Sequence, residues 1–252
     1  MEMGKAAIIL TTGLVAGFLN TVAGGGSLLT MPVLIFMGLP SAVANGTNRV
    51  AILFQTANAV YVFKKKGFSD FAYGTLVTIP ALAGAWLGAQ LAIGTDDRVF
   101  NRILAVVMLA VMGYTFLRPE RPGSAPETGS GSPSTRKRIL SIVAFFFLGV
   151  YGGFIQAGIG FLILAALTLI RNYDLVKANA IKVYIVFLYT LVALATFLAA
   201  GKVDWTLGLV LAVGNSAGAW LGSYFAVLKG SSALRWILLA AVVVFSFRLL
   251  WM

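Results

Sequence analysis

Two glycine-rich breaks interrupt apolar runs of the chain and contain groups well suited to bind a ligand. The first break, residues 24–27, reads Gly-Gly-Gly-Ser, and the second, residues 156–160, reads Gln-Ala-Gly-Ile-Gly. A helix that restarts after such a break points free backbone N–H groups and the positive end of its dipole at the gap. Ser27 and Gln156 add side-chain hydrogen-bonding groups. The breaks therefore favour binding of an anion.

A second pair of motifs places an asparagine and a cation at the start of an apolar segment. These are residues 45–49, Asn-Gly-Thr-Asn-Arg, and residues 179–182, Asn-Ala-Ile-Lys. A cation that faces a membrane normally has a partner, yet no carboxylate is near Arg49 or Lys182 in the sequence. A bound anion would supply that partner. Two alternatives stay open: the cations reach the lipid headgroups from loop ends, and the asparagines are helix caps.

Composition places these motifs in a membrane. Of the 252 residues, 60% are hydrophobic and 11% are charged. Several uncharged stretches approach or exceed the roughly 20 residues that span a bilayer. The apolar runs lack the alternation of a β-barrel, so the predicted fold class is an all-α polytopic membrane protein. The net charge of +11 comes from Lys and Arg in short loops, which indicates membrane topology rather than nucleic-acid binding.

Several chemistries are excluded by the residue types that the sequence lacks or keeps out of its apolar segments. The sequence has no Cys and no His, which excludes disulfides, thiol chemistry and imidazole metal sites. All eight Asp and Glu lie in loops or at segment ends. Acid–base catalysis, carboxylate proton relays and cation binding therefore have no evident agent. We expect no enzymatic activity, no cofactor and no metal.

The chain contains an internal repeat. Shifted by 134 residues it aligns with itself without a gap, and Gly-Ala-Trp-Leu-Gly at residues 84–88 recurs at residues 218–222. The sequence predicts repeat one over residues 1–117 and repeat two over residues 139–252, joined by a linker over residues 118–138. Four of the seven prolines lie in the linker, so we expect it to be a flexible tether.

Each repeat begins with a broken or re-entrant pair of segments, and three spanning segments follow. The expected segments are 6–20, 27–37, 48–63, 71–93 and 99–117 in repeat one, and 139–155, 159–170, 181–200, 205–228 and 233–251 in repeat two. The second segment of each repeat is short for a membrane span. Whether the first pair spans or re-enters stays open. Each repeat crosses the bilayer an odd number of times in either case, so we expect two inverted-topology repeats.

Loop charges predict which side of the membrane each loop faces. Most Lys and Arg, including the lysines at 64–66 and those of the linker, fall in loops on one side. The positive-inside rule makes that side cytoplasmic, which places the linker in the cytoplasm and both termini outside. The lysines at 64–66 align with uncharged residues 198–200. This difference is expected when equivalent loops face opposite sides.

The breaks and the asparagine motifs together resemble the TauE/SafE family of sulfite exporters. The resemblance covers the chain outside the linker and is carried by residues 17–32, 44–49, 149–160 and 178–182. The motif residues that it implies are Asn20, Gly24, Gly25, Gly26, Asn45, Thr47, Asn48 and Arg49 in repeat one, and Gln156, Gly158, Gly160, Asn179 and Lys182 in repeat two. With Ser27 they make up the expected substrate-binding set.

The resemblance implies a multi-pass permease of a bacterial-type inner membrane. Its expected partner is sulfite or a related small sulfur-containing anion such as an organosulfonate, exported from the cytoplasm. We expect the anion to bind between the two breaks near mid-membrane and to move by alternating access. The alternative function is an anion channel with the same pore. Apart from the lipid bilayer, the sequence leaves open a homodimer, and it also leaves open the exact anion and the coupling ion.

Overall fold

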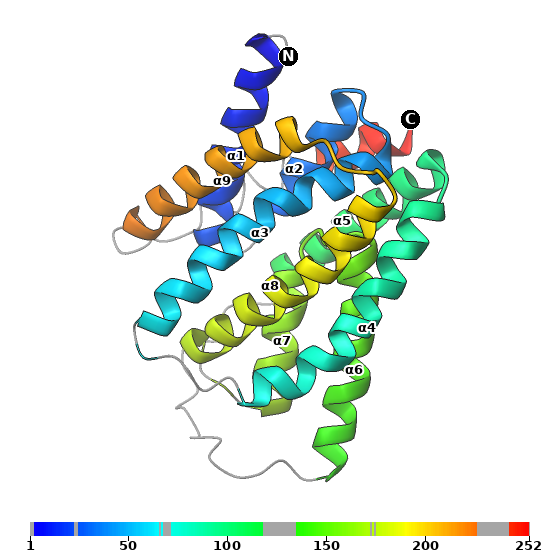
Figure 1. The fold of residues 1–252 in the computed structure, drawn as a ribbon. Helices are drawn as coiled ribbons and strands as arrows, with labels where there is room; N and C mark the ends of the chain where they lie inside the picture. The colour runs from blue at the N-terminus through cyan, green and yellow to red at the C-terminus, as the bar shows by residue number, and fades with distance from the viewer. Residues whose placement is uncertain are drawn as a thin grey trace.

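The apolar runs fold as helices. The computed structural model describes residues 3–22, 25–65, 67, 72–117, 135–171, 173, 175–225 and 242–251, and none of these residues belongs to a strand. The helices are α1 (Met3–Val22), α2 (Ser27–Phe36), α3 (Ser41–Lys65), α4 (Ala72–Gly94), α5 (Asp97–Leu117), α6 (Thr135–Phe154), α7 (Ile159–Arg171), α8 (Leu175–Ala199), α9 (Trp205–Phe225) and a final helical segment, 242–250 (Figure 1). The all-helical prediction is confirmed for these residues.

Three of the described helices are long and apolar enough to cross a membrane, by length and composition. They are Tyr73–Gly94 in α4, Thr135–Phe154 in α6 and Val176–Ala199 in α8. Helix α2 has 10 residues and α7 has 13. At a rise of about 1.5 Å per residue neither reaches across a hydrocarbon core of about 30 Å. Helix α3 is as long as α8, with 25 residues each, but more of its side chains are polar.

Helices α3 and α8 begin earlier than the sequence predicts. They start at Ser41 and Leu175, seven and six residues before the expected starts. At α3 the cap comes from a distant part of the chain, because the Ser41 N–H donates to Asp97 Oδ1 at 2.7 Å and Ser41 Oγ donates to Asn101 Oδ1 at 2.9 Å. Residues 45–49 therefore lie inside the first turns of α3. The helix-cap alternative for both asparagines is wrong.

Helix α6 begins within the last residues that the sequence assigns to the linker. It starts at Thr135, so the last four residues assigned to the linker form its first turn. The remainder, 118–134, lies outside the described residues, as do residues 226–241 of the last predicted segments.

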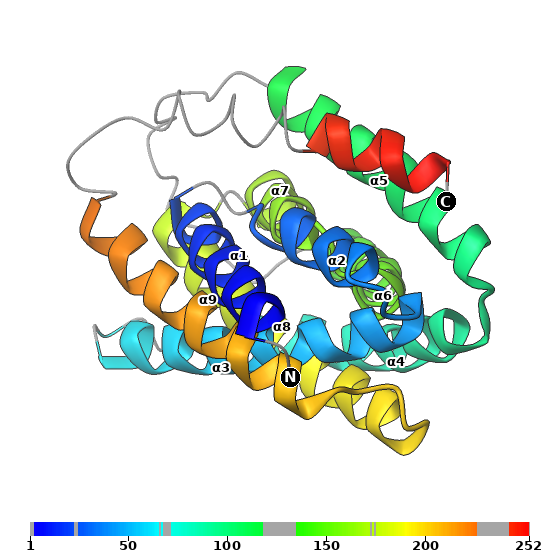
Figure 2. The same ribbon diagram turned by 90° about the horizontal axis from the view of Figure 1, so that it is seen from above.

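Helix packing crosses between the two halves of the chain. Helix α1 packs against α9, α6 packs against α4, and α3 packs against α8 and α9 (Figures 1 and 2). Glycine makes these contacts close: a Cβ on Gly84 would overlap the Phe146 carbonyl, and one on Gly218 would overlap the Leu14 carbonyl. Both glycines open a copy of Gly-Ala-Trp-Leu-Gly. This motif is therefore a packing surface, which is the usual role of paired small residues in membrane helices.

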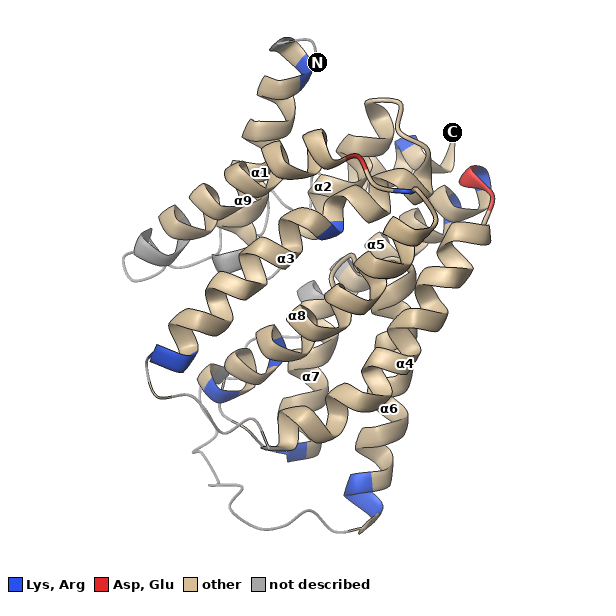
Figure 3. Ribbon diagram, viewed as in Figure 1, with Lys and Arg blue, Asp and Glu red and all other residues tan. Residues whose placement is uncertain are grey.

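Charged side chains gather at the two ends of the helix bundle. The C-terminus of α3 and the N-termini of α6 and α8 carry Lys and Arg at one end, which we call the basic end (Figure 3). The described Asp residues lie at the opposite end, beside α5 and α9. Helix α3 runs toward the basic end, and its neighbour α8 runs away from it.

Candidate ligand-binding cavity

The two glycine breaks are in direct contact. Gly26 precedes α2, and the break between α6 and α7 covers residues 155–158. The backbone N–H of Gly158 donates to the hydroxyl oxygen of Ser27 at 3.2 Å. Segments that lie 131 residues apart in the sequence thus meet inside the protein.

Backbone geometry explains the residue types in the breaks. A Cβ on Gly26 would overlap the carbonyl of Ala16, so α2 can start this close to α1 only without a side chain. Gly158 has φ +69°, a left-handed conformation that strains any side chain. Gln156 has φ +65° and is the only non-glycine residue with a positive φ in the described part of the chain. Such strained positions cluster at functional sites.

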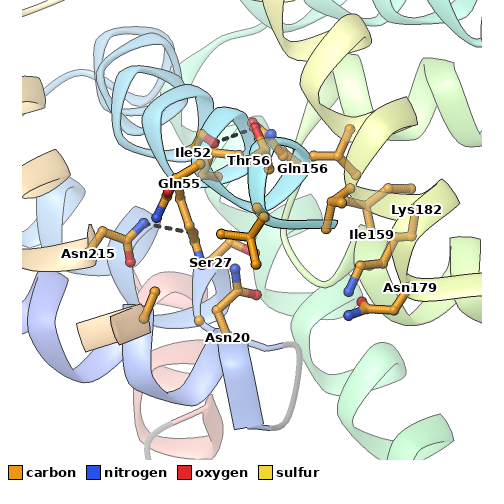
Figure 4. A pocket seen from close by; sticks show the side chains of 18 of the residues that line it. Asn20, Ser27, Ile52, Gln55, Thr56, Gln156, Ile159, Asn179, Lys182 and Asn215 are labelled. Atoms are coloured by element: carbon orange, nitrogen blue, oxygen red, sulfur yellow. Dashed lines mark hydrogen bonds between the residues drawn. The ribbon is translucent and has the colours of Figure 1, made fainter. Parts of the chain in front are cut away.

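A cavity of about 370 Å³ lies beside the contact between the breaks. Six amide side chains line it, together with the hydroxyls of Ser27, Thr30 and Thr56: Asn20, Gln55, Asn58, Gln156, Asn179 and Asn215. Figure 4 shows Asn179 and Lys182 next to each other on one wall, and Asn215 with Gln55 on the opposite wall. Asn20 and Ser27 lie between the two walls. A cavity of this size admits a small ligand.

The cavity carries one positive charge. Lys182 is the only charged side chain among the described residues that line it, which include no Asp and no Glu. Lys182 and Asn179 lie on one face of α8, because they are three residues apart. Neither side chain forms a hydrogen bond or an ion pair with another described residue. The ammonium group thus lies in the wall with an amide beside it and without a counter-ion among the residues that the structure describes.

The predicted binding residues separate into two groups. Those that line the cavity are Asn20, Gly26, Ser27, Gln156, Gly160, Asn179 and Lys182. Those outside its lining are Gly25, Asn45, Thr47, Asn48, Arg49 and Gly158, and Gly24 lies outside the described residues. The fold therefore brings the two breaks and the second asparagine motif to one cavity, and it places the first asparagine motif elsewhere.

The first asparagine motif binds the end of helix α6. Asn45 Nδ2 donates to the carbonyl oxygen of Phe154 at 2.6 Å. Arg49 Nη2 donates to the carbonyl oxygens of Gly152, at 3.0 Å, and of Gly153. The last carbonyls of a helix have no partner within it and carry partial negative charge, so an amide and a guanidinium stabilise them. The partners of Arg49 in this structure are these backbone oxygens.

Burial decides between the two interpretations of Arg49 as a membrane cation. Arg49 is 0% exposed, and its guanidinium carbon lies 5.0 Å from the centre of the Phe197 ring. The alternative that it extends to the lipid headgroups is therefore wrong. Thr47, in the same motif, accepts a hydrogen bond from the backbone N–H of Asp204 at 2.9 Å. These contacts all join α3 to the second half of the chain.

Asn215 is a cavity residue that the motifs do not predict. Its Nδ2 donates to Gln55 Oε1 at 3.0 Å, so it joins α9 to α3 across the cavity wall. Asn215 is the one amide side chain in the largely apolar helix α9. A polar group inside a membrane helix is a general indicator of a functional site, and that signal would have found it.

Comparison with known proteins gives consistent matches along the chain. The family model described as "Sulfite exporter TauE/SafE" matches residues 9–249. A "Probable membrane transporter protein" of Haemophilus influenzae is 32% identical, over 96% of this chain and 92% of that protein. The "Probable membrane transporter protein YfcA" of Escherichia coli K12 is 26% identical, over 97% of this chain and 89% of that protein. No solved structure matches the chain.

Proposed function

Since the chain belongs to the TauE/SafE sulfite exporter family, we propose that it is a secondary transporter that exports sulfite or a related organosulfonate across the inner membrane. The relatives named as membrane transporters support transport in general. The sulfur anion and the outward direction are inferred from the family, whereas the cavity and the helix arrangement support an anion and an alternating-access cycle.

The observation that carries the choice of an anion is the uncompensated charge of Lys182. No carboxylate is among the described lining residues, while Asn179 lies beside Lys182 and further amides line the rest of the cavity. An anion 4 Å away would be attracted by about 4 kcal/mol at an effective dielectric constant of about 20. Removal of water from both ions offsets much of this attraction. Hydrogen bonds from neutral amides such as Asn179 then orient the anion without holding it too tightly for release.

The apolar part of the cavity lining favours a sulfonate with a short carbon chain among the sulfur anions. Val183 and Val186 lie on the same helix as Lys182 and line the same cavity. In a bound organosulfonate the oxygens would face Lys182 and Asn179, and the carbon chain would lie against the two valines. Sulfite would use only the polar part of this site.

The helix arrangement supports inverted-topology repeats. At the 134-residue shift α3 coincides with α8 from end to end, α1 corresponds to α6, and α4 corresponds to α9. The helix contacts show the same correspondence: α1 packs on α9, and their counterparts α6 and α4 pack on each other. Helices α3 and α8 run in opposite directions. A two-fold axis in the membrane plane would produce these relations.

The position of the cavity supports loading from the cytoplasm. The cavity extends along α3 to Val62 and Phe63, next to the lysines that end this helix at the basic end. The positive-inside rule makes the basic end cytoplasmic, with both termini outside. At the other end of the cavity the lining residues Ile52 and Val186 are each only 7% exposed. A cavity that extends to one side only suits a carrier better than an open channel.

Flux through purified protein in liposomes tests the function. Labelled sulfite, sulfate, a two-carbon sulfonate and a small organic cation are offered in turn, and counterflow is measured. We expect saturable flux of the sulfonate or of sulfite. Lys182→Gln should lower kcat/KM at least about tenfold, equivalent to about 1.4 kcal/mol, because the attraction for the anion is lost. Lys182→Arg should retain most of the flux.

Lys65→Gln is the matched control, because Lys65 is an exposed lysine at the basic end and does not line the cavity. It should leave the flux within about twofold of the wild type, a change of about 0.4 kcal/mol. Linear, unsaturated flux of the anion would identify a channel instead. Flux of the cation alone, or equal flux in Lys182→Gln and the wild type, would refute the anion site.

A further inference from the structure

Helices α3 and α8 carry a continuous line of side chains from the cavity into the closed part of the protein. On α8 this face runs from Lys182 through Val186 to Tyr189, and on α3 it runs from Ile52 to Arg49 and Asn48. Residues three, four and seven positions apart share one face of a helix. Ile52 and Val186 line the cavity, whereas Asn48, Arg49 and Tyr189 do not.

Ile52 and Val186 occupy equivalent places in the two halves of the chain. Their numbers differ by 134, the shift that aligns the sequence with itself. Both are 7% exposed, at the closed end of the cavity. The same shift relates Asn48, one turn of α3 from Ile52, to Lys182, one turn of α8 from Val186. The apolar pair Ile52 and Val186 thus lies between two polar residues, Asn48 and Lys182, that are equivalent in the two repeats.

The groups behind this pair are buried, and several of their polar atoms have no hydrogen-bond partner among the described residues. Both amide atoms of Asn48 and the Nε and Nη1 of Arg49 make no hydrogen bond among the described residues. The hydroxyl of Tyr189 lies near the side chains of Gln156 and Thr190 but makes no hydrogen bond of ordinary geometry with a described residue. Asn48 and Arg49 are 0% exposed, and Tyr189 is 1% exposed. Buried polar atoms without hydrogen bonds cost folding free energy in a low-dielectric interior. A cluster of several such atoms therefore indicates a function that requires them.

Gly152 connects the two sides of this buried group. Its carbonyl oxygen accepts the Arg49 hydrogen bond at 3.0 Å, and a Cβ placed on it would lie 3.3 Å from the Tyr189 hydroxyl. Gln156 connects the group to the cavity, because it lines the cavity and its Nε2 donates to the hydroxyl of Thr190, beside Tyr189 in sequence, at 3.0 Å. The buried group therefore lies immediately behind the cavity wall.

We infer that Ile52 and Val186 form an apolar gate, and that Asn48, Arg49 and Tyr189 form a second site for an oxyanion behind it, closed in this conformation. The inference rests on the proposed function, because it takes the cavity as the path of an anion. The guanidinium, amide and phenol donors suit the oxygens of the anion that Lys182 binds first. Opening of the gate exchanges the roles of the two halves, as expected for inverted repeats.

The absence of cysteine from the sequence allows a direct test by thiol labelling. Asn179→Cys and Asn48→Cys are made separately, and each full-length protein in detergent is treated with methanethiosulfonate ethylsulfonate, a small anionic thiol reagent. We expect rapid reaction at residue 179 and a reaction at least about tenfold slower at residue 48, because the gate blocks the anionic reagent. Equal rates at the two positions would overturn the gate.

The gate residues are then reduced in size. Ile52→Ala with Val186→Ala should raise the labelling rate of Asn48→Cys at least about tenfold. Phe54→Ala with Leu191→Ala is the matched control, since Phe54 and Leu191 lie on the same two helices, are 50% and 41% exposed and do not line the cavity. It should leave the rate unchanged. A double alanine variant that does not fold is replaced by Ile52→Ala alone, for which an unchanged rate would equally overturn the gate.

Protection by an anion separates a second binding site from a water-filled space. In the gate variant, ethanesulfonate should slow labelling at residue 48 as it does at residue 179. If only residue 179 is protected, the second site is wrong while the proposed function stands. If neither position is protected and no sulfur anion crosses liposomes containing the wild type, the proposed function fails as well.

Discussion

Asn45→Ala should lower the stability of the protein, whereas Asn179→Ala should lower its anion flux. The two asparagines nevertheless follow an alanine in equivalent motifs. Asn45 is 0% exposed and donates to the carbonyl oxygen of Phe154 at 2.6 Å, at the end of α6. Removal of the amide leaves a buried carbonyl without this donor, at a cost of about 1–3 kcal/mol. Interhelical hydrogen bonds in membrane proteins average only about 0.6 kcal/mol, so we expect the lower part of that range. Asn179 faces the cavity and should add little to stability.

The assay is thermal unfolding of the purified proteins in detergent, followed by far-ultraviolet circular dichroism. For a chain of about 250 residues each 1 kcal/mol corresponds to about 2–4 °C, so Asn45→Ala should melt about 2–6 °C below the wild type. Asn179→Ala should melt within about 1 °C of it and should lose anion flux instead. Asn45→Asp is a second check, because a carboxylate keeps the size but repels the Phe154 carbonyl. Equal melting temperatures for Asn45→Ala and the wild type would refute the assignment of Asn45 to the end of α6.

Two further predictions concern packing and helix capping. Gly84→Ala should destabilise the protein by about 1–3 kcal/mol, because the new Cβ overlaps the Phe146 carbonyl. Gly94→Ala in the same helix is the control: its Cβ would meet nothing within 4 Å, so it should be neutral or slightly stabilising in the same melting assay. Asp204→Ala should lower the free energy of unfolding by about 0.5–2 kcal/mol, since Asp204 Oδ1 accepts the Leu207 N–H at 3.0 Å at the start of α9. Asp204→Asn should keep most of this stability, because its side-chain oxygen can accept the same hydrogen bond. An unchanged melting temperature for Asp204→Ala would contradict this cap.

The sequence predicts the helices well because each depends on local signals. Apolar runs and glycine breaks give the order of the helices, and the shortness of α2 and α7 follows from the break positions alone. The residue that caps α3 could not be predicted, because Asp97 lies 56 residues further along the chain, but the start itself has a local signal. Pro40, directly before Ser41, marks the true boundary, since proline disfavours a helical conformation in the residue before it.

The cavity is predicted only in part, for a related reason. The breaks and the second asparagine motif lie at the cavity because glycine clusters and a cation without a carboxylate are visible locally. The partner of Asn45 is a carbonyl 109 residues away, which no local pattern can indicate. The pairing of Asn215 with Gln55 spans 160 residues and is equally hidden. Sequence patterns thus identify groups that need partners, and the fold decides which partners they receive.

The two cations have different surroundings, and their positions differ by one residue between the repeats. At the 134-residue shift Arg49 aligns with Val183, and Lys182 aligns with Asn48. One residue turns a side chain by about 100° around a helix of 3.6 residues per turn. In α3 Arg49 binds two carbonyl oxygens at the end of α6, while in α8 both Lys182 and its neighbour Val183 line the cavity. The cavity thus lies against this part of α8 and not against the equivalent part of α3. In this conformation two nearly identical motifs thus supply one cation that is bound to backbone carbonyls and one that faces the cavity.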